Sequence, residues 1–260
     1  MKLSKPNTVP EKLDTNINIK IIAGIIFSVF IFHTYVNNFS STENAEVIIS
    51  IFSFLNPLVV TIAAFIVAIK YMDAGIYRKS YIFLGFAYLG IFLGEVTYLV
   101  YDIVLQLDPY PSIADIFFFM QYPLAIAYLI LNIRFFASFS NKYKMWIILL
   151  PLLILISYSS SALTELGEAG FDFFYGLVFV TSAGVLLAFA VLGSTIFREG
   201  LIGKAWMILV IGILSLTIGD TWYYYLELSG EFELSHPVNL FWYAGYWIII
   251  YALYKHKKTI

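Results

Sequence analysis

Lys and Arg occur only in every second polar segment of this chain, and the segments between them carry acidic residues instead. The 15 basic residues are Lys2, Lys5, Lys12, Lys20, Lys70, Arg78, Lys79, Arg134, Lys142, Lys144, Arg198, Lys204, Lys255, Lys257 and Lys258. The intervening loops hold Glu43, Glu46, Asp108, Glu165, Glu168, Glu231 and Glu233. Because cytoplasmic loops of multi-spanning proteins have an excess of Lys and Arg, this alternation predicts a multi-pass protein of the cell membrane with both termini in the cytoplasm.

The composition excludes most soluble classes of protein. Hydrophobic residues make up 61% of the chain and charged residues 12%, whereas soluble domains have about 25% charged residues. No basic face is left for nucleic acid, so the expected partner is the lipid bilayer. The sequence contains no Cys, which excludes disulfides and thiolate metal ligands. The apolar segments contain no interior Lys for a retinal Schiff base, and no cofactor is predicted.

Eight apolar segments are long enough to cross a membrane, since a hydrocarbon core of about 30 Å requires roughly 20 residues per helix. They are Ile19–Val36, Glu46–Ile69, Tyr81–Leu105, Ile113–Ile133, Met145–Ala162, Asp172–Phe197, Ala205–Leu226 and Pro237–Tyr254. The predicted fold is therefore an all-α polytopic membrane protein with eight transmembrane helices. We interpret the first segment as a retained span, because no convincing small-residue cleavage site follows it.

The two halves of the sequence repeat each other. The pattern Gly94-Glu95-x-x-Tyr98 with Asp102 recurs at one constant offset as Gly219-Asp220-x-x-Tyr223 with Glu227. An offset one residue shorter relates Asp115, Phe117 and Tyr122 to Asn239, Phe241 and Tyr246. Four spans in each half make both copies start on the same side, which predicts two parallel four-helix repeats. The predicted division is a cytoplasmic segment at 1–18, repeats at 19–134 and 145–254, and a short basic tail at 255–260.

Acidic residues inside the predicted spans are the strongest candidates for a site. A carboxylate in hydrocarbon costs about 2.5–3.5 kcal/mol on insertion scales, so it normally faces a cavity or a partner. The spacing of Glu95, Tyr98 and Asp102 places them on one helix face, and the second copy repeats this face. The pattern predicts an outward-facing acidic and Tyr-lined cavity between the third, fourth, seventh and eighth helices. Its predicted ligand-binding residues are Glu95, Tyr98, Asp102, Asp115, Tyr122, Asp220, Tyr223, Glu227, Asn239 and Tyr246.

Structural roles for these residues are the alternative. Glu95 and Asp220 could be protonated and hold helices together by hydrogen bonds, and Asp115 and Asn239 could cap helix N-termini. If Glu95 and Asp220 share one site without a basic neighbour, we expect that they do not both ionise while it is empty. Replacement of either acid by its amide should then cost little folding stability. His33 and His236 lack the close spacing of a metal motif, so no metal site is predicted.

The stretch Pro109-Tyr-Pro-Ser-Ile-Ala-Asp115-Ile-Phe-Phe-Phe-Met-Gln-Tyr-Pro123 resembles a segment of multi-helix membrane regions in bacterial and archaeal signalling proteins. Those regions often precede diguanylate cyclase (GGDEF) or histidine kinase modules. The resemblance implies a sensory or receptor-like membrane module, and it leaves the ligand class open. This chain carries no such output module, and its second copy reads Ser235-His-Pro-Val-Asn239, so signalling would require a separate membrane or cytoplasmic partner.

A fainter similarity connects the chain to lysoplasmalogenase-type membrane enzymes, which also have eight helices and intramembrane Asp residues. It rests on Thr217-Ile-Gly-Asp220 and Tyr243-x-x-Tyr246. The similarity implies a lipid hydrolase with Glu95 and Asp220 as an acid/base pair, although the first acid is Glu here.

Three functions therefore follow from the sequence in order of preference. The first is a non-enzymatic sensory module, and the second is an intramembrane hydrolase that uses paired carboxylates for general acid/base work. The third is a small-solute or cation transporter built on the repeat. The inner halves of the third and seventh helices are apolar, which counts against transport.

Overall fold

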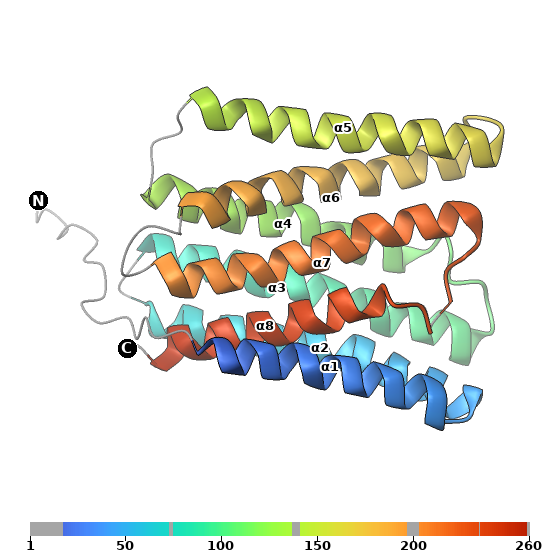
Figure 1. The fold of residues 1–260 in the computed structure, drawn as a ribbon, viewed down its shortest axis with the longest axis horizontal. Helices are drawn as coiled ribbons and strands as arrows, with labels where there is room; N and C mark the ends of the chain where they lie inside the picture. The colour runs from blue at the N-terminus through green and yellow to red at the C-terminus, as the bar shows by residue number, and fades with distance from the viewer. Residues whose placement is uncertain (1–17, 73–74, 137–140, 197–202, 234, 259–260) are drawn as a thin grey trace, which may run out of the picture.

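The computed structural model describes residues 18–72, 75–136, 141–196, 203–233 and 235–258. These residues form helices and no strands. The elements are α1 (Ile19–Phe39), α2 (Thr42–Lys70), α3 (Gly75–Leu99), the π-helical segment η1 (Val100–Leu105), α4 (Ile113–Phe136), α5 (Asn141–Leu166), α6 (Phe171–Ile196), α7 (Gly203–Ser229) and α8 (Asn239–Lys258). Figure 1 shows the helices lying side by side in one bundle, with the start of α1 and the end of α8 at the same end.

The two ends of the bundle differ in charge. One end, which we call the acidic end, carries the connections α1–α2, α3–α4, α5–α6 and α7–α8, with exposed Asp108, Glu168 and Glu231. The opposite end, which we call the basic end, holds exposed Lys70 and Arg134. The alternation of charge in the sequence therefore corresponds to the two opposite ends of the bundle, whose helices are shown in Figure 1.

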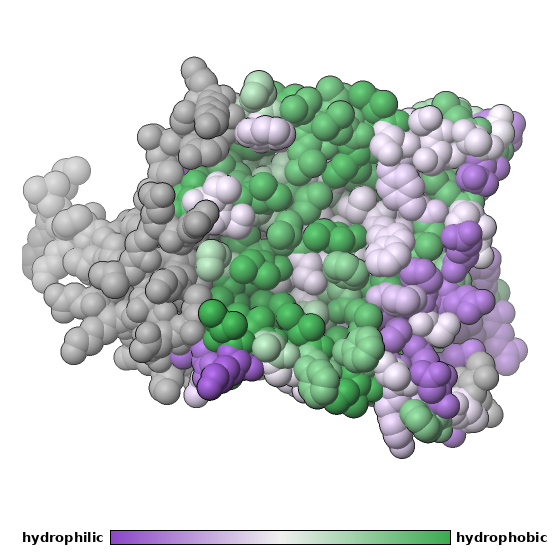
Figure 2. Space-filling model, in the orientation of Figure 1, coloured by the Kyte–Doolittle hydropathy of each residue, from purple (hydrophilic) through white to green (hydrophobic). Residues whose placement is uncertain are grey.

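The surface between these ends is that of a protein embedded in a membrane. Seven helices of the described chain, α1 to α7, are long and apolar enough to cross a bilayer. Large apolar side chains point away from the bundle, for example Phe27 at 65% exposure and Ile148 at 69%. Figure 2 shows a broad hydrophobic band across the visible face of the molecule, with polar residues gathered at the acidic end. Such continuous exposed apolar surface is stable only in contact with lipid or another apolar partner.

The predicted spans agree with the observed helices within a few residues, except that α3 begins at Gly75, six positions before the predicted start at Tyr81. The segment α8 is shorter than the others and is not among the seven apolar spans. It nevertheless packs inside the bundle against α7, α2 and α1. A Cβ atom on Gly212 of α7 would lie only 2.5 Å from Ile249 Cγ1 of α8, so these two backbones approach closely, as small residues allow in membrane bundles.

The core at the basic end is closed by a cluster of large aromatic side chains. Tyr81, Tyr128 and Trp206 are at most 1% exposed, and their rings contact one another with centroids 5.5 to 6.2 Å apart. The Tyr81 hydroxyl lies 2.7 Å from Nδ1 of His256, which is also fully buried. This packing fills the bundle between α3, α4, α7 and α8, so the open space of the molecule lies toward the acidic end.

Candidate functional site

A cavity of about 600 Å³ occupies the half of the bundle near the acidic end. Its wall comes mainly from α3, α4, α6, α7 and α8, with Ser53 added from α2 and with Tyr158 and Leu166 from α5. Toward the basic end it stops at Ile91 on α3 and Leu216 on α7. Nine of the ten predicted ligand-binding residues line it: Glu95, Tyr98, Asp115, Tyr122, Asp220, Tyr223, Glu227, Asn239 and Tyr246.

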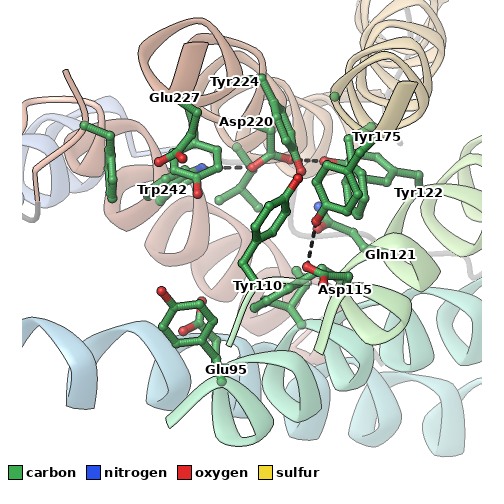
Figure 3. Close-up of a pocket in the computed structure, with 18 of the residues that line it drawn as sticks. Glu95, Tyr110, Asp115, Gln121, Tyr122, Tyr175, Asp220, Tyr224, Glu227 and Trp242 are labelled. Atoms are coloured by element: carbon green, nitrogen blue, oxygen red, sulfur yellow. Dashed lines mark hydrogen bonds between the residues drawn. The ribbon is translucent and has the colours of Figure 1, made fainter. Parts of the chain in front are cut away.

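Asp220 is held by hydrogen bonds from two helices. The indole Nε1 of Trp242 on α8 donates to Oδ1 at 2.9 Å, and the Tyr122 hydroxyl on α4 donates to Oδ2 at 3.3 Å. Both interactions are visible in Figure 3. Since both partners donate, Asp220 acts as an acceptor that joins α7 to α4 and α8. This arrangement is suited to a carboxylate, because hydrogen bonds to an ionised acceptor are stronger than neutral ones.

Glu95 lies in the same cavity without such support. Its carboxyl group accepts no hydrogen bond from any residue that the structure describes, and it stands apart from the network around Asp220 (Figure 3). The position that corresponds to Trp242 in the other half of the sequence is Phe118, which packs over Gly94 and has no N–H to donate. Tyr246, the counterpart of Tyr122, makes no hydrogen bond to Glu95. The two acids are therefore equivalent in sequence pattern and different in environment.

Asp115 both caps α4 and ties it to α6. Its Oδ2 accepts from the Ser112 backbone N–H at 2.6 Å, while Ser112 Oγ accepts from the Ala114 N–H at 3.1 Å. Ser112 is therefore the N-cap of α4, and Asp115 supports it from the third helical position as the acid of a capping box does; the structural alternative expected Asp115 itself to be the cap. The other oxygen of Asp115 accepts from the Tyr175 hydroxyl of α6 at 2.6 Å (Figure 3). Asn239, its counterpart, begins α8, is 3% exposed and also lines the cavity.

Tyr110 and Asp172 form part of the wall near the acidic end. The Tyr110 hydroxyl donates to Oδ1 of Asp172 at 2.9 Å, and its ring meets that of Tyr175 edge to face with centroids 4.9 Å apart. Partial burial, followed by the hydrogen bond to Asp172, raises the pKa of Tyr110. Tyr110 therefore remains a protonated donor, and it links the α3–α4 connection to α6 beside the cavity.

Asp102 is the predicted residue that the structure places elsewhere. It is exposed and does not line the cavity. The reason is that α3 does not continue as an α-helix beyond Leu99. Its last turn, η1, is π-helical, and the wider i→i+5 turn rotates Asp102 away from the face of Glu95 and Tyr98. In α7 the helix stays regular to Ser229, so Glu227 lines the cavity beside Tyr223.

Sequence reasoning missed the contribution of α6 and several aromatic residues. The missed polar and aromatic lining residues include Tyr110, Gln121, Tyr158, Asp172, Tyr175, Phe179, Tyr224, Phe232, Trp242 and Tyr243. The sequence does place an acid, Asp172, and an aromatic residue, Tyr175, at the start of a predicted span. Their relevance depends on α6 packing against α4, which no local sequence pattern indicates.

A metal centre has no support in the described residues. No group of three or more His, Asp or Glu side chains lies close enough there to hold an ion. His33 instead lies 3.1 Å from the Asn37 side-chain amide through Nε2, and Asn37 donates to the backbone oxygen of Ser235. These contacts connect α1 to the segment before α8.

The cavity thus combines five carboxyl groups, many tyrosines and a closed inner end, and it draws on residues from both halves of the sequence. No protein-family model, curated protein or solved structure matches this chain. Its function is therefore inferred from the residues that line the cavity.

Proposed function

We propose that this chain is a multi-pass membrane receptor module that binds a small molecule in the cavity and signals through a separate partner. The observation that carries the proposal is the position of the 600 Å³ cavity, which lies only in the half of the bundle near the acidic end. Cavities of about 300–1,000 Å³ with a few convergent polar groups are typical of small-molecule sites. The segment Pro109–Pro123, on which the resemblance to sensory regions rests, contributes Tyr110, Asp115 and Tyr122 to this wall.

The closed inner end favours binding over transport. A transporter needs a polar path that can open to the opposite side. Here Tyr81, Tyr128, Trp206 and His256 fill the bundle between the cavity and the basic end, and all four are at most 1% exposed. A ligand that enters from the acidic end would therefore stay on that side, as it does in a receptor.

The proposed architecture is eight spans in two parallel repeats, with α8 as the eighth. Its support is a pair of matching contacts. Phe118 of α4 packs over Gly94 of α3, and Trp242 of α8 packs over Gly219 of α7. A second match is also found. A Cβ on Gly90 would meet the Phe117 carbonyl at 2.8 Å, and the Ser215 hydroxyl donates to the Phe241 carbonyl at 2.8 Å. In this arrangement the acidic end faces outward and the basic end faces the cytoplasm.

A lipid hydrolase is the second candidate, favoured by one observation. Glu95 has no hydrogen-bond partner among the described residues and shares the cavity with Asp220, so the two could act as general base and acid on a lipid. The discriminating measurement is product release. A receptor binds its ligand in saturable fashion and leaves it unchanged, whereas a hydrolase adds water to the vinyl-ether bond of a lipid and releases a fatty aldehyde and the remaining glycerol alcohol.

Access to the cavity from the acidic end is the property that tests the receptor proposal. The chain contains no Cys, so single cysteines report cleanly. Ser53→Cys places a thiol of nearly the same size in the cavity wall. Ser80→Cys is the matched control, since Ser80 is 0% exposed near the basic end and does not line the cavity.

In sealed vesicles of known orientation, a small membrane-impermeant thiosulfonate added on the acidic side should modify the Ser53→Cys protein and leave the Ser80→Cys protein unmodified. Modification is measured as the mass of the intact protein. If the Ser53→Cys thiol stays unmodified under conditions in which a Glu168→Cys protein reacts fully, the cavity is closed to that side and the receptor proposal fails.

A further inference from the structure

We infer that the ligand of the cavity is an organic cation, a protonated amine on an apolar body, whose ammonium group pairs with Glu95 between aromatic walls. The inference rests on the proposed function, because it requires the cavity to be a binding site reached from the acidic end. It adds the chemical class of the ligand, which the architecture alone leaves open.

The charge of the cavity is one-sided. Five carboxyl side chains line it, and no Lys, Arg or His is among the described lining residues. Three of the five, Asp115, Asp172 and Asp220, each accept a hydrogen bond from a side chain of the protein. Glu95 has no such donor. A partly buried carboxylate without a partner is unfavourable, so a ligand that supplies positive charge and N–H donors would complete this site.

The remaining wall suits a cation with an apolar body. Thirteen aromatic residues line the cavity, including Tyr122, Tyr246 and Trp242 around the level of the two acids. A cation near the face of an aromatic ring is attracted by the ring quadrupole, and this attraction increases when water is excluded. A neutral ligand would bring no positive charge to Glu95, and an anion would be repelled by the acidic wall.

Tyr243 provides an independent indication of a missing polar partner. Its side chain is 2% exposed and lines the cavity, yet its hydroxyl has no hydrogen-bond partner among the described residues. Buried hydroxyl groups are nearly always hydrogen-bonded. The Tyr243 hydroxyl and the Glu95 carboxyl are thus two polar groups in the wall of one cavity that lack a hydrogen-bond partner in the described chain.

The geometry also distinguishes an organic cation from a metal ion. In the described part of the chain no three acidic or His side chains converge closely enough to coordinate an ion. The acids are spread over α3, α4, α6 and α7, and the space between them is about 600 Å³. A larger, delocalised or apolar cation fits this space better than a small ion that demands several oxygen ligands at about 2.0–2.6 Å.

Three molecules with one carbon skeleton test the role of charge: 3,3-dimethylbutylamine, 3,3-dimethylbutan-1-ol and 3,3-dimethylbutanoate carry positive, zero and negative charge at neutral pH. Each is added to the Ser53→Cys protein before the thiosulfonate. We expect the amine to slow the modification of the introduced thiol and to raise the melting temperature, and the alcohol and the acid to do neither. Equal protection by the alcohol or the acid would overturn the inference.

Glu95→Gln should weaken the amine effect about tenfold or more, because a hydrogen bond to a charged group is lost. Glu165→Gln is the matched control, since Glu165 is exposed at the acidic end and does not line the cavity, and it should leave the effect unchanged. Correct folding of both variants is checked by the melting temperature without ligand. An unchanged amine effect in a folded Glu95→Gln protein would contradict the assignment of Glu95.

The amine could be a free solute or the headgroup of a lipid. The same protection assay in vesicles of phosphatidylglycerol, with and without phosphatidylethanolamine, separates the two sources: protection by the ethanolamine lipid alone indicates a headgroup, and protection by the added amine indicates a solute. The proposed ligand class and the proposed receptor function would also fail in different ways. If the Ser53→Cys thiol reacts and no cationic probe protects it, the ligand class is wrong while the open cavity stands. If that thiol does not react at all, the receptor proposal itself fails.

Discussion

The two acids of the cavity occupy matching positions in the repeated sequence and have opposite environments. Asp220 accepts hydrogen bonds from Trp242 and Tyr122. Glu95 has Phe118 where Asp220 has Trp242, and it accepts no hydrogen bond from the described residues. One change of side chain on the neighbouring helix, from an indole to a phenyl ring, accounts for the loss of one of the two donors.

Within one cavity, one acid is held by hydrogen bonds from the protein and the other is not. Asp220 fixes α7 to α4 and α8, so its role is accounted for inside the protein. Glu95 lines the same cavity and has no internal role of this kind among the described residues, and our proposal assigns it to the ligand.

The largest expected effect concerns the side of the membrane from which the cavity is reached. We call the surroundings of Glu95 and of Asp220 within this cavity its two half-sites. Single cysteines introduced as Glu168→Cys, near the acidic end, and as Lys142→Cys, in the first turn of α5, lie at opposite ends of the bundle. Because basic residues mark the cytoplasmic side, an impermeant maleimide on intact cells should label the Glu168→Cys protein and should label the Lys142→Cys protein only after lysis. The reverse pattern would invert the orientation and would open both half-sites to the cytoplasm.

The next effect separates the two acids by stability. Asp220→Leu leaves the Trp242 N–H and the Tyr122 hydroxyl without their acceptor, and each unsatisfied buried donor costs about 1–3 kcal/mol. Glu95→Leu removes no hydrogen bond and should change the free energy of unfolding by less than about 1 kcal/mol. Melting temperatures in the same detergent provide the measurement. Equal losses for the two variants would show that Glu95 has a structural role that its environment does not reveal.

The sequence predicted the part of this arrangement that depends on local patterns. The lengths of the apolar segments and the alternation of charge located the helices. The expectation that an acid inside a span faces a cavity or a partner identified Glu95 and Asp220. The unequal environments were not predictable, because they depend on which side chain α8 or α4 places opposite each acid. The same limit explains Tyr175 and Asp172, which reach the cavity only because α6 packs against α4. Asp102 was misplaced because nothing in the local pattern indicates that α3 ends in a π-helical turn.

The expected effect of amide substitution also changes for one member of the acid pair. From the sequence, replacement of either acid by its amide should cost little stability. The structure leaves that expectation for Glu95 and alters it for Asp220, which uses both oxygens as acceptors. Asn has only one acceptor oxygen. Asp220→Asn would therefore keep one of the two hydrogen bonds and place its NH₂ group, itself a donor, next to the other donor.

A smaller effect is expected when the difference between the half-sites is removed. Phe118→Trp gives the Glu95 half-site an indole at the position that Trp242 occupies beside Asp220. If the new N–H reaches Glu95, it competes with a ligand, and the affinity for 3,3-dimethylbutylamine should fall about tenfold, since a charge-assisted hydrogen bond is worth roughly 1.5–3 kcal/mol. Phe118→Leu is the control for altered packing over Gly94. A greater loss with Leu than with Trp would mean that packing and not hydrogen bonding decides the affinity.

The smallest expected effect compares the two matching tyrosines. Tyr122 and Tyr246 are both buried, at 4% and 7% exposure, but only Tyr122 donates to an acid, Asp220, at 3.3 Å. Tyr122→Phe should therefore lower the free energy of unfolding by about 0.5–1.5 kcal/mol, the usual net contribution of one hydrogen bond, and Tyr246→Phe should lower it by less. Chemical denaturation of the two variants in one detergent measures the difference. If Tyr246→Phe is the more damaging, its hydroxyl supports Glu95 in solution, and the two half-sites are more alike than their hydrogen bonds indicate.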